Sequence, residues 1–305
     1  MTLPSVDPAL YPFSSHHHRL ASGHQLHYLD EGPSQEKDNN TASAPPLVMV
    51  HGNPSWSFYY RDLIQHFRTS RRCLAPDHIG MGWSDRPSEQ GYNYTLSQRM
   101  ADFAEWLDAV APDQVIDLIV HDWGGAIAIS WAARNPERVR RLIITNTWAF
   151  PLPPGRGLPF GLKFARSRLG RFLIHRANAF SGLAATRLGT QHKLPKSVAD
   201  GLTAPYRGHP SRRLATLKFV EDIPLGPDDP AYAVLQETEQ RLPALKDHPI
   251  LLAWGTHDWV FTPEVLALWQ GHFPDAQVTC YDEAGHYLNE DAGQALIDRV
   301  AAFLN

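Results

Sequence analysis

The order of apolar and polar residues along the chain predicts strands and helices in alternation. Strand-length apolar runs lie at about 24–29, 46–50, 72–76, 115–120, 140–145, 249–254 and 276–281. Most of the later runs are continuous, as in Leu142–Ile144, which is typical of parallel strands buried on both faces. Helical patterns occur at 97–110, 125–133, 263–271 and 291–304. This alternation predicts an α/β fold in which helices cover a mostly parallel sheet.

The interval from about 150 to 240 interrupts the alternation. It opens with a Pro- and Gly-rich segment at 151–157 and contains short, basic, helix-like pieces such as Leu162–Arg176 and Lys196–Thr203. We expect a helical cap at 150–240, inserted into a core formed by 1–149 and 241–305. Within the cap, the helical spacing of Phe160, Phe164 and Phe172 predicts that they form its own core, with the lining of a pocket as the alternative.

Composition narrows the possible partners. The chain has 305 residues, of which 43% are hydrophobic and 20% charged, and its formal net charge is −4. Such a balance lacks the basic surface that nucleic-acid binding requires, and no run approaches the ~20 apolar residues of a membrane span. We therefore expect no nucleic-acid partner and no membrane partner, while the oligomeric state stays open.

The cysteine and histidine content predicts neither a metal site nor a cofactor. The two cysteines, Cys73 and Cys280, fall in separate predicted strands, and the start of the chain lacks the pattern of a signal peptide. We expect a reduced, cytoplasmic location. The run His16–His18 falls in a predicted early strand, where neighbouring side chains face opposite ways, so we expect a surface run there.

The segment from Leu118 to Gly125 carries the strongest chemical signal. An apolar run ends at Asp122, and Trp123, Gly124 and Gly125 then open a helical pattern. This is the strand–turn–helix pattern of a nucleophile elbow, with Asp122 in place of the usual Ser. A carboxylate attacks carbon without first losing a proton, and it suits a saturated carbon that bears a leaving group.

Two further residues follow later strands and complete a candidate triad. Asp258 follows the run at 249–254, and His286 follows the run at 276–281. The carboxyl ends of parallel strands meet at one sheet edge, so Asp122, Asp258 and His286 can converge there. Asp122 would form an alkyl ester, His286 would activate the water that hydrolyses it, and Asp258 would orient His286. The backbone N–H groups of Asn53 and Trp123 would hold the oxyanion.

Each of these residues also has a structural interpretation. Asp122 alone could be the N-cap of the following helix, and Asp258 alone could be an ordinary turn residue. The order nucleophile, acid, histidine makes catalysis the better interpretation for the three together. We expect Asp77 to shape the turn that follows it, and His121 to be a buried, hydrogen-bonded residue beside the elbow.

Motifs across the core add a family resemblance. His51–Trp56 after a strand, Asp77–Pro87, the elbow and the pair Gly285–His286 together resemble the haloalkane dehalogenases of the α/β-hydrolase superfamily. The resemblance covers nearly all of the core and is weak in the cap. It implies an α/β-hydrolase core with a mostly parallel eight-stranded sheet, and hydrolysis of a small halogenated aliphatic substrate by water to an alcohol, a halide ion and a proton.

The same resemblance implies a pair of halide-binding groups. The side-chain amide of Asn53 and the indole N–H of Trp123 would hold the departing halide, since a halide in a dry pocket needs two converging donors. None of the nine tryptophans falls within 150–240, so the cap offers no alternative donor of that kind. Asn146 stands where another dehalogenase type has a Glu, which gives the acid role to Asp258. We expect Asp258→Asn to be severe and Asn146→Ala mild.

Other members of the superfamily remain alternatives. An epoxide hydrolase would use the same triad but needs cap tyrosines, for which Tyr206 and Tyr232 are candidates. A fluoroacetate dehalogenase usually has Arg where this chain has Trp123, and a coelenterazine luciferase tends to have Glu in place of Asn146. A catalytically inactive receptor with the same fold would lack one member of the triad, whereas this sequence has all three.

Overall fold

The structure, a computed structural model, contains one sheet and two groups of helices. It describes residues 6–33, 44–153 and 159–305, with only the backbone described at 183–186. The strands are β1 (Ser15–Arg19), β2 (Gln25–Glu31), β3 (Leu47–Val50), β4 (Cys73–Pro76), β5 (Ile116–Asp122), β6 (Val139–Thr147), β7 (Ile250–Gly255) and β8 (Gln277–Tyr281). The helices are α1 (Arg61–Phe67), α2 (Leu96–Val110), α3 (Trp123–Ala132), α4 (Phe160–Arg166), α5 (Arg168–Ala177), α6 (Lys196–Thr203), α7 (Leu214–Glu221), α8 (Pro230–Arg241), α9 (Pro263–His272) and α10 (Leu288–Leu304).

The sheet has eight strands in the order β1-β2-β4-β3-β5-β6-β7-β8. The pairs β1–β2 and β2–β4 are antiparallel, and every other pair is parallel. The mostly parallel eight-stranded sheet expected from the sequence is therefore confirmed, and each apolar run identified above coincides with a strand.

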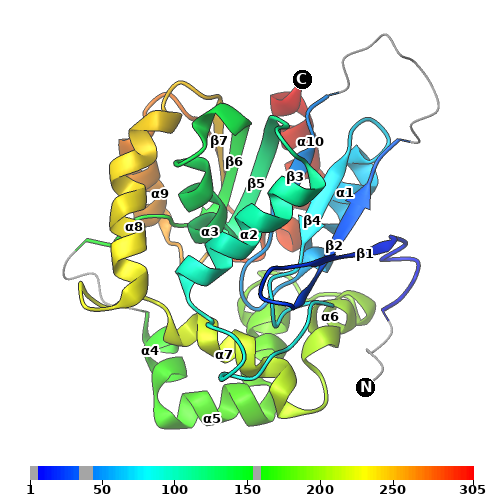
Figure 1. Cartoon of the computed structure of the whole chain (residues 1–305), viewed down its shortest axis with the longest axis vertical. Helices are drawn as coiled ribbons and strands as arrows, with labels where there is room; N and C mark the ends of the chain where they lie inside the picture. Colours follow the sequence, from blue (N-terminus) through cyan, green and yellow to red (C-terminus); the bar gives the residue numbers. More distant parts are fainter. Residues whose placement is uncertain (1–5, 34–43, 154–158) are drawn as a thin grey trace.

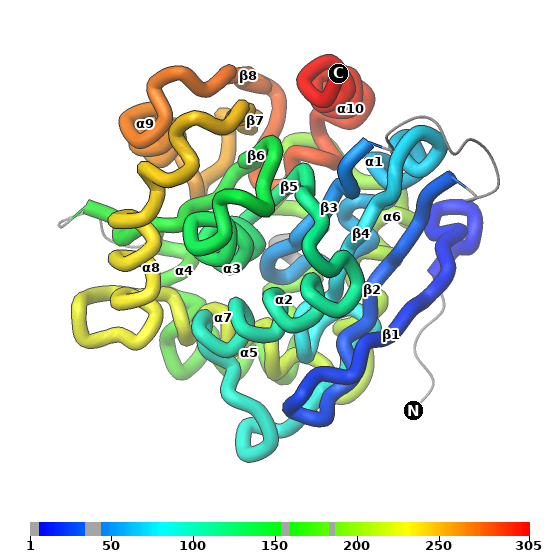
Figure 2. Tube along the Cα trace, turned by 45° about the horizontal axis from the view of Figure 1, so that its top comes forward, coloured from blue at the N-terminus to red at the C-terminus, as the bar shows by residue number. Residues whose placement is uncertain are grey.

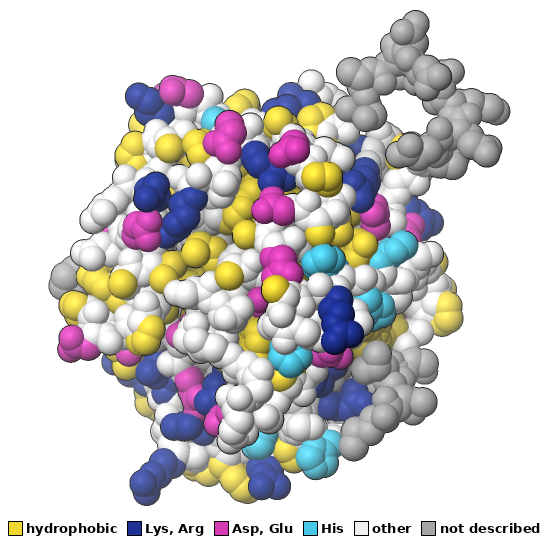
Figure 3. All heavy atoms as spheres, viewed as in Figure 1, with side chains coloured by type: hydrophobic (Ala, Val, Ile, Leu, Met, Phe, Trp, Pro, Cys, Tyr) yellow, Lys and Arg dark blue, Asp and Glu magenta, His cyan; other side chains and the backbone are white. Residues whose placement is uncertain are grey.

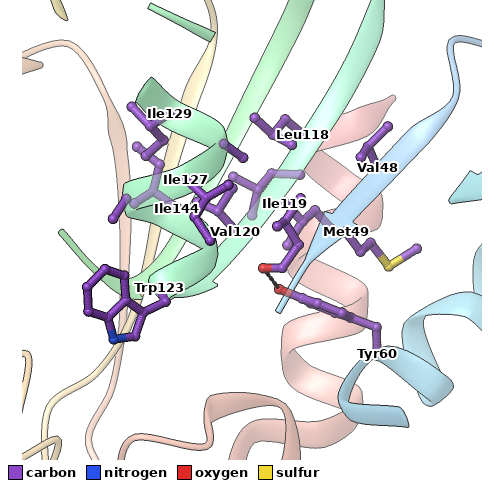
Figure 4. Close-up of a cluster of buried hydrophobic side chains, with 14 of the residues drawn as sticks. Val48, Met49, Tyr60, Leu118, Ile119, Val120, Trp123, Ile127, Ile129 and Ile144 are labelled. Carbon is purple, nitrogen blue, oxygen red and sulfur yellow. Dashed lines mark hydrogen bonds between the residues drawn. The ribbon is translucent and has the colours of Figure 1, made fainter. Parts of the chain in front are cut away.

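Helices lie on both faces of the sheet. The helices α2, α3 and α8 pack together on one face, and α1 and α10 pack together on the other (Figure 2). All residues of α3 are buried, which makes it the central helix behind β5. Figure 4 shows why the central strands are continuously apolar: Ile119 and Val120 of β5 pack among Met49 of β3 and Ile144 of β6. Tyr60 lies at the end of β3, and its hydroxyl donates a hydrogen bond to the Val50 carbonyl at 2.9 Å.

The helices α4–α7, which we call the cap helices, follow β6 and lie at one end of the sheet (Figure 1). The expected single piece at 162–176 is two helices, because Ser167 has an extended backbone and ends α4. The Ser167 hydroxyl then accepts a hydrogen bond from the Gly170 N–H and caps α5. Ala165 and Ile174 pack against Leu217 and Val220 of α7 in a small separate core.

The far limit of the inserted segment stays a prediction. Helix α8, which ends at Arg241, packs on α2 and α3, and its Thr238 hydroxyl donates to the Ser130 hydroxyl of α3 at 2.7 Å. The near limit adjoins residues 154–158, so part of the expected Pro- and Gly-rich segment lies outside the described residues. No helix in the described part of the chain is both long and apolar enough to cross a membrane.

Candidate active site

The turn between β5 and α3 presents Asp122 at the carboxyl edge of the sheet. Asp122 has φ 50° and ψ −128°, a conformation that non-glycine residues adopt only under strain. The glycines that follow allow close packing: a Cβ on Gly124 would overlap the Val50 carbonyl, and one on Gly125 would overlap the Thr147 side chain. The elbow expected from the sequence is therefore present, and Figure 4 shows β5 leading into α3 with Trp123 at the turn.

The three candidate catalytic residues lie together although they come from distant parts of the chain. Nδ1 of His286 lies 2.9 Å from Oδ2 of Asp258, and Nε2 lies 3.8 Å from Oδ2 of Asp122. Asp258 follows β7, and His286 lies between β8 and α10, as the sequence predicted. All three side chains are buried. The imidazole thus connects the elbow carboxylate to a second carboxylate on its far side.

Asp258 is held by two neighbours besides His286. The Val260 N–H donates to Oδ1 at 2.7 Å, and Nδ2 of Asn146 donates to Oδ2 at 3.0 Å. Asn146 also bonds both backbone groups of Gly255, which anchors it between β6 and β7. Sequence reasoning missed this contact. Because of it, we expect a larger effect of Asn146→Ala than the mild one predicted from the sequence.

Burial and charge act in opposite directions on the two groups that face each other. Burial raises the pKa of Asp122, while His286 and the backbone N–H groups of Asn53 and Trp123 lower it, and the outcome is a raised pKa. Burial lowers the pKa of His286, but the carboxylates of Asp258 and Asp122 outweigh it, so that pKa also lies above its usual value.

Asn53 and Trp123 flank the Asp122 carboxylate. The Asn53 N–H donates to Oδ1 of Asp122 at 2.6 Å, and the Trp123 N–H bonds the same carboxylate. Nδ2 of Asn53 donates to the Thr216 carbonyl at 3.2 Å, which uses one of its two N–H bonds and fixes the amide. Among the described residues, no group accepts a hydrogen bond from the Trp123 indole N–H.

These side chains open into a cavity of about 430 Å³. Its walls are mainly apolar and come from residues near the sheet edge and from the segment that contains the cap helices: Trp148, Leu152, Leu162, Phe180, Val220, Ile223, Leu225, Trp259, Val260 and Phe261. Asn53, Asp122, Trp123 and His286 also line it. An apolar cavity with a few converging polar groups is the usual form of a small-molecule site.

Two sequence-based placements in the cap are wrong. Tyr206, a candidate acid for epoxide opening, is fully buried, and its hydroxyl donates to the Ser55 carbonyl at 2.7 Å instead of facing the cavity. Of the two candidate tyrosines, Tyr232 alone lines the cavity. Phe160, Phe164 and Phe172 neither form the cap core nor line the cavity, because all three are exposed. Their helices bury the opposite face, which carries smaller residues.

Asp77 and His121 have the structural contacts expected from the sequence. Asp77 accepts hydrogen bonds from the N–H groups of Ser57 and Trp83 and lies 2.8 Å from Nδ1 of His27. His121 is fully buried, and its Nε2 lies 2.7 Å from the His286 carbonyl oxygen. No cluster of three or more potential metal ligands occurs within 6–33, 44–153 and 159–305.

Comparisons with known proteins agree with the fold. The family described as alpha/beta hydrolase fold matches residues 45–293. A cis-3-alkyl-4-alkyloxetan-2-one decarboxylase from Shewanella oneidensis is 40% identical over 97% of this chain and 89% of its own length. Haloalkane dehalogenase 2 from Mycobacterium tuberculosis is 32% identical over 97% of this chain and 95% of its own length. A crystal structure of a mutant haloalkane dehalogenase from Agrobacterium tumefaciens has a TM-score of 0.83 and 22% identity, covering 98% of this chain and 99% of that one.

Proposed function

The chain belongs to the α/β-hydrolase fold family, and from this premise we propose that Asp122 displaces a leaving group from a saturated carbon. The geometry supports hydrolytic dehalogenation best, in which a small haloalkane and water give an alcohol, a halide ion and a proton. One observation carries this choice: Trp123, with its indole N–H, and Asn53, with its side-chain amide, both line the apolar cavity beside Asp122. Such donors stabilise a small anion that leaves without water around it.

In the first step, a carboxylate oxygen of Asp122 attacks the carbon that bears the halogen. The carbon–halogen bond breaks, the halide leaves with the bonding pair, and an alkyl ester forms on Asp122. The halide accepts hydrogen bonds from the Trp123 indole and from the second N–H of the Asn53 amide. Because the Thr216 carbonyl already holds the first N–H, the amide needs no reorientation.

In the second step, His286 takes a proton from water, and the oxygen attacks the ester carbonyl. The backbone N–H groups of Asn53 and Trp123, which bond Asp122 in the free enzyme, hold the oxyanion. The alcohol then leaves, and Asp122 is restored. Ester formation removes the Asp122 charge that helps to raise the His286 pKa. The imidazole therefore becomes easier to keep neutral at the step that needs a base.

A panel of bromoalkanes tests this function. The wild-type protein should release halide and alcohol in equal amounts, and Asp122→Asn should abolish both. Asp113→Asn, on an exposed residue, is the matched control and should keep full activity. Halide release by freshly prepared Asp122→Asn would remove the nucleophile assignment. A parallel epoxide panel should give less diol than halide, because Tyr206 is not available to protonate an opening ring and Tyr232 is the one candidate tyrosine that lines the cavity. Diol formation that Tyr232→Phe abolishes would instead favour an epoxide hydrolase.

A second candidate function rests on the greater identity to the oxetan-2-one decarboxylases, 40% against 32% for the dehalogenases. Attack of Asp122 on C4 of such a ring would break the ring C–O bond and free a carboxylate on C3. The C3–carboxylate bond would then break, its electrons would form the C3–C4 double bond, and Asp122 would leave with its bonding pair. The products are an alkene and CO₂, and no water is consumed.

Assays of both substrates distinguish the two functions. A cis-3,4-dialkyl oxetan-2-one and a bromoalkane of similar chain length should be supplied to the same preparation, with CO₂ and alkene measured in one and halide in the other. Halide release with no CO₂ supports dehalogenation, and CO₂ release with no halide supports decarboxylation. In either case Asp122→Asn should be inactive, because both reactions begin with the same displacement.

We also propose that the segment at about 150–240 acts as a cap and that the protein works in the cytoplasm. Support for the cap comes from Leu162, Phe180 and Val220, which lie beyond β6 and line the cavity with the core residues. Support for the location comes from Cys73 and Cys280, which are both free thiols. Limited proteolysis would test whether the segment forms a cap, and export of the protein to an oxidising compartment would test its location.

A further inference from the structure

The outer surface of α4 and α5 exposes large apolar side chains. Six of the eight exposed large hydrophobic residues in the described chain belong to the inserted segment: Phe160, Phe164, Leu169, Phe172, Leu188 and Leu225. Phe160 is 84% exposed, and Leu169 and Phe172 are each 58% exposed. Phe160 and Phe164 lie four residues apart on α4, and Leu169 and Phe172 lie three apart on α5, so each pair shares a helix face. Nothing within the described chain covers these faces.

The same surface is strongly basic, although the whole chain has a net charge of −4. No Asp or Glu occurs between Glu137 and Asp200. Of the cations on α4 and α5, Arg166 donates to the Ile223 carbonyl and Arg171 pairs with Glu221. Lys163, Arg168 and Arg176 are exposed and have no ion-pair partner in the part of the chain that the structure describes. Figure 3 shows Lys, Arg and hydrophobic side chains side by side along the lower edge, where α5 lies in Figure 1.

This surface adjoins the cavity. Pro159 and Leu162, which flank Phe160 in the chain, line the cavity wall. Leu225 both lines the cavity and is 62% exposed, so it lies at the mouth. The Trp259 indole, another part of the wall, donates to the Leu188 carbonyl at 3.0 Å. The exposed apolar residues therefore continue the apolar lining outward to the surface.

We propose that the outer cap face (Phe160, Lys163, Phe164, Arg168, Leu169 and Phe172) docks on an anionic lipid surface, from which the cavity receives apolar substrates. Phe and Leu side chains enter the interface between headgroups and acyl chains, and Lys and Arg bind the headgroup phosphates. Such docking is peripheral, so it needs no membrane-spanning helix.

The charge pattern favours a lipid surface over a second copy of the chain. A two-fold contact through this face would bring Lys163, Arg168 and Arg176 of one copy against the same residues of the other, with no acidic residue on α4 or α5 to pair with them. A phosphate-bearing surface neutralises the cations and covers the apolar side chains at the same time. It also gives a substrate of low water solubility a direct route to the mouth.

Vesicle co-sedimentation of the full-length protein tests the proposal. The wild-type protein should bind phosphatidylcholine vesicles that contain phosphatidylglycerol and bind pure phosphatidylcholine vesicles weakly. High salt should lower the binding to the anionic vesicles toward that weak level, because it screens the cations from the headgroups. Phe164→Ser with Phe172→Ser should lower the partition coefficient about ten-fold. Lys163→Gln with Arg168→Gln should lower it about five-fold for each cation removed.

Matched control variants distinguish vesicle binding through the outer cap face from non-specific vesicle binding. Val115→Ser with Val278→Ser removes exposed apolar side chains outside the cap, and Arg19→Gln with Lys246→Gln removes exposed cations there. Both controls should bind as the wild type does. Turnover of a short water-soluble substrate by every variant verifies folding and is independent of docking.

Three results would overturn the proposal. The first is no binding of the wild type to anionic vesicles at low salt. The second is equal loss of binding in the cap variants and their controls. The third is a wild-type dimer in light scattering that Phe164→Ser with Phe172→Ser converts to a monomer, which would assign the face to a second copy. None of these results depends on which reaction Asp122 performs, so they leave the proposed function untouched.

Discussion

Nδ1 of His286 lies 2.9 Å from Oδ2 of Asp258, and this contact leaves Nε2 of the same ring directed at Asp122. The hydrogen bond requires a proton on Nδ1, so the neutral imidazole carries its free lone pair on Nε2. That is the tautomer a general base needs beside the elbow carboxylate. The charge of Asp258 also stabilises the imidazolium that forms when His286 takes a proton from water.

The pKa of His286 should therefore lie above 6.5 in the free enzyme, because the charges of Asp258 and Asp122 outweigh burial. Asp258→Asn should lower it, and Asp122→Asn, which imitates the uncharged ester, should lower it less. Ester hydrolysis needs neutral His286, so its rate should rise with pH through the pKa that His286 has in the alkyl-enzyme, which lies below that of the free enzyme because the ester carries no charge. Heteronuclear NMR of the imidazole measures the shift, with His286→Phe identifying the signal. An unchanged pKa in Asp258→Asn would contradict the pairing.

Replacing His286 with Phe separates the two proposed functions. With a bromoalkane, the variant should release one halide per protein and then stop, because the ester on Asp122 lacks an activated water. Intact-mass spectrometry should then show the added alkyl group. With an oxetan-2-one, turnover should continue, since the proposed elimination consumes no water. An unmodified mass after halide release would argue against the ester intermediate.

The sequence predicts the parts of this protein that depend on local pattern. Continuous apolar runs locate the strands because both sheet faces are covered, and Asp122 before two glycines indicates the elbow because few other residues permit so close a turn. The order of Asp122, Asp258 and His286 then suffices to place them at one sheet edge, since parallel strands share their carboxyl ends.

What the sequence does not predict depends on packing between distant segments. Nothing near Asn53 indicates the Thr216 carbonyl, which reaches it from a cap helix. The spacing of Phe160 and Phe164 shows that one helix face is apolar but not whether anything covers it, and the structure leaves it uncovered. The break at Ser167 did have a signal, because Ser is a preferred N-cap, yet the apolar periodicity on either side obscured it.

Asn146 connects Asp258 to the strand β6, and its removal should slow ester hydrolysis. Its Nδ2 donates to Oδ2 of Asp258 at 3.0 Å, and its Oδ1 accepts the Gly255 N–H at 2.8 Å. Asn146→Ala leaves that buried N–H unpaired and places Ala at φ 32°, so the free energy of unfolding should fall by about 1–3 kcal/mol. We expect about ten-fold slower hydrolysis, with more alkyl-enzyme at steady state in quenched mass spectra.

Asn146→Gly is the matched variant for that experiment. Glycine accepts the positive φ without strain but lacks the amide, so it isolates the hydrogen bonds to Asp258 and Gly255. Both variants should accumulate the ester. If Asn146→Gly hydrolyses it at the wild-type rate, backbone strain alone explains the Ala variant, and Asn146 does not position the acid.

Trp123→Phe tests the assignment of the leaving-group donors. The substitution removes the indole N–H beside Asp122 but keeps an aromatic ring against Trp148 and Phe219. Loss of one such donor should slow halide release in the first turnover about 10²–10³-fold. A chloroalkane should be affected more than an iodoalkane, because the smaller anion concentrates its charge and gains more from each hydrogen bond. Trp148→Phe, which makes the same substitution elsewhere in the cavity wall, is the control and should slow both substrates slightly and equally. If Trp123→Phe slows halide release from the chloroalkane and the iodoalkane equally, altered packing explains the loss of rate. Trp123 would then not be assigned as a halide donor.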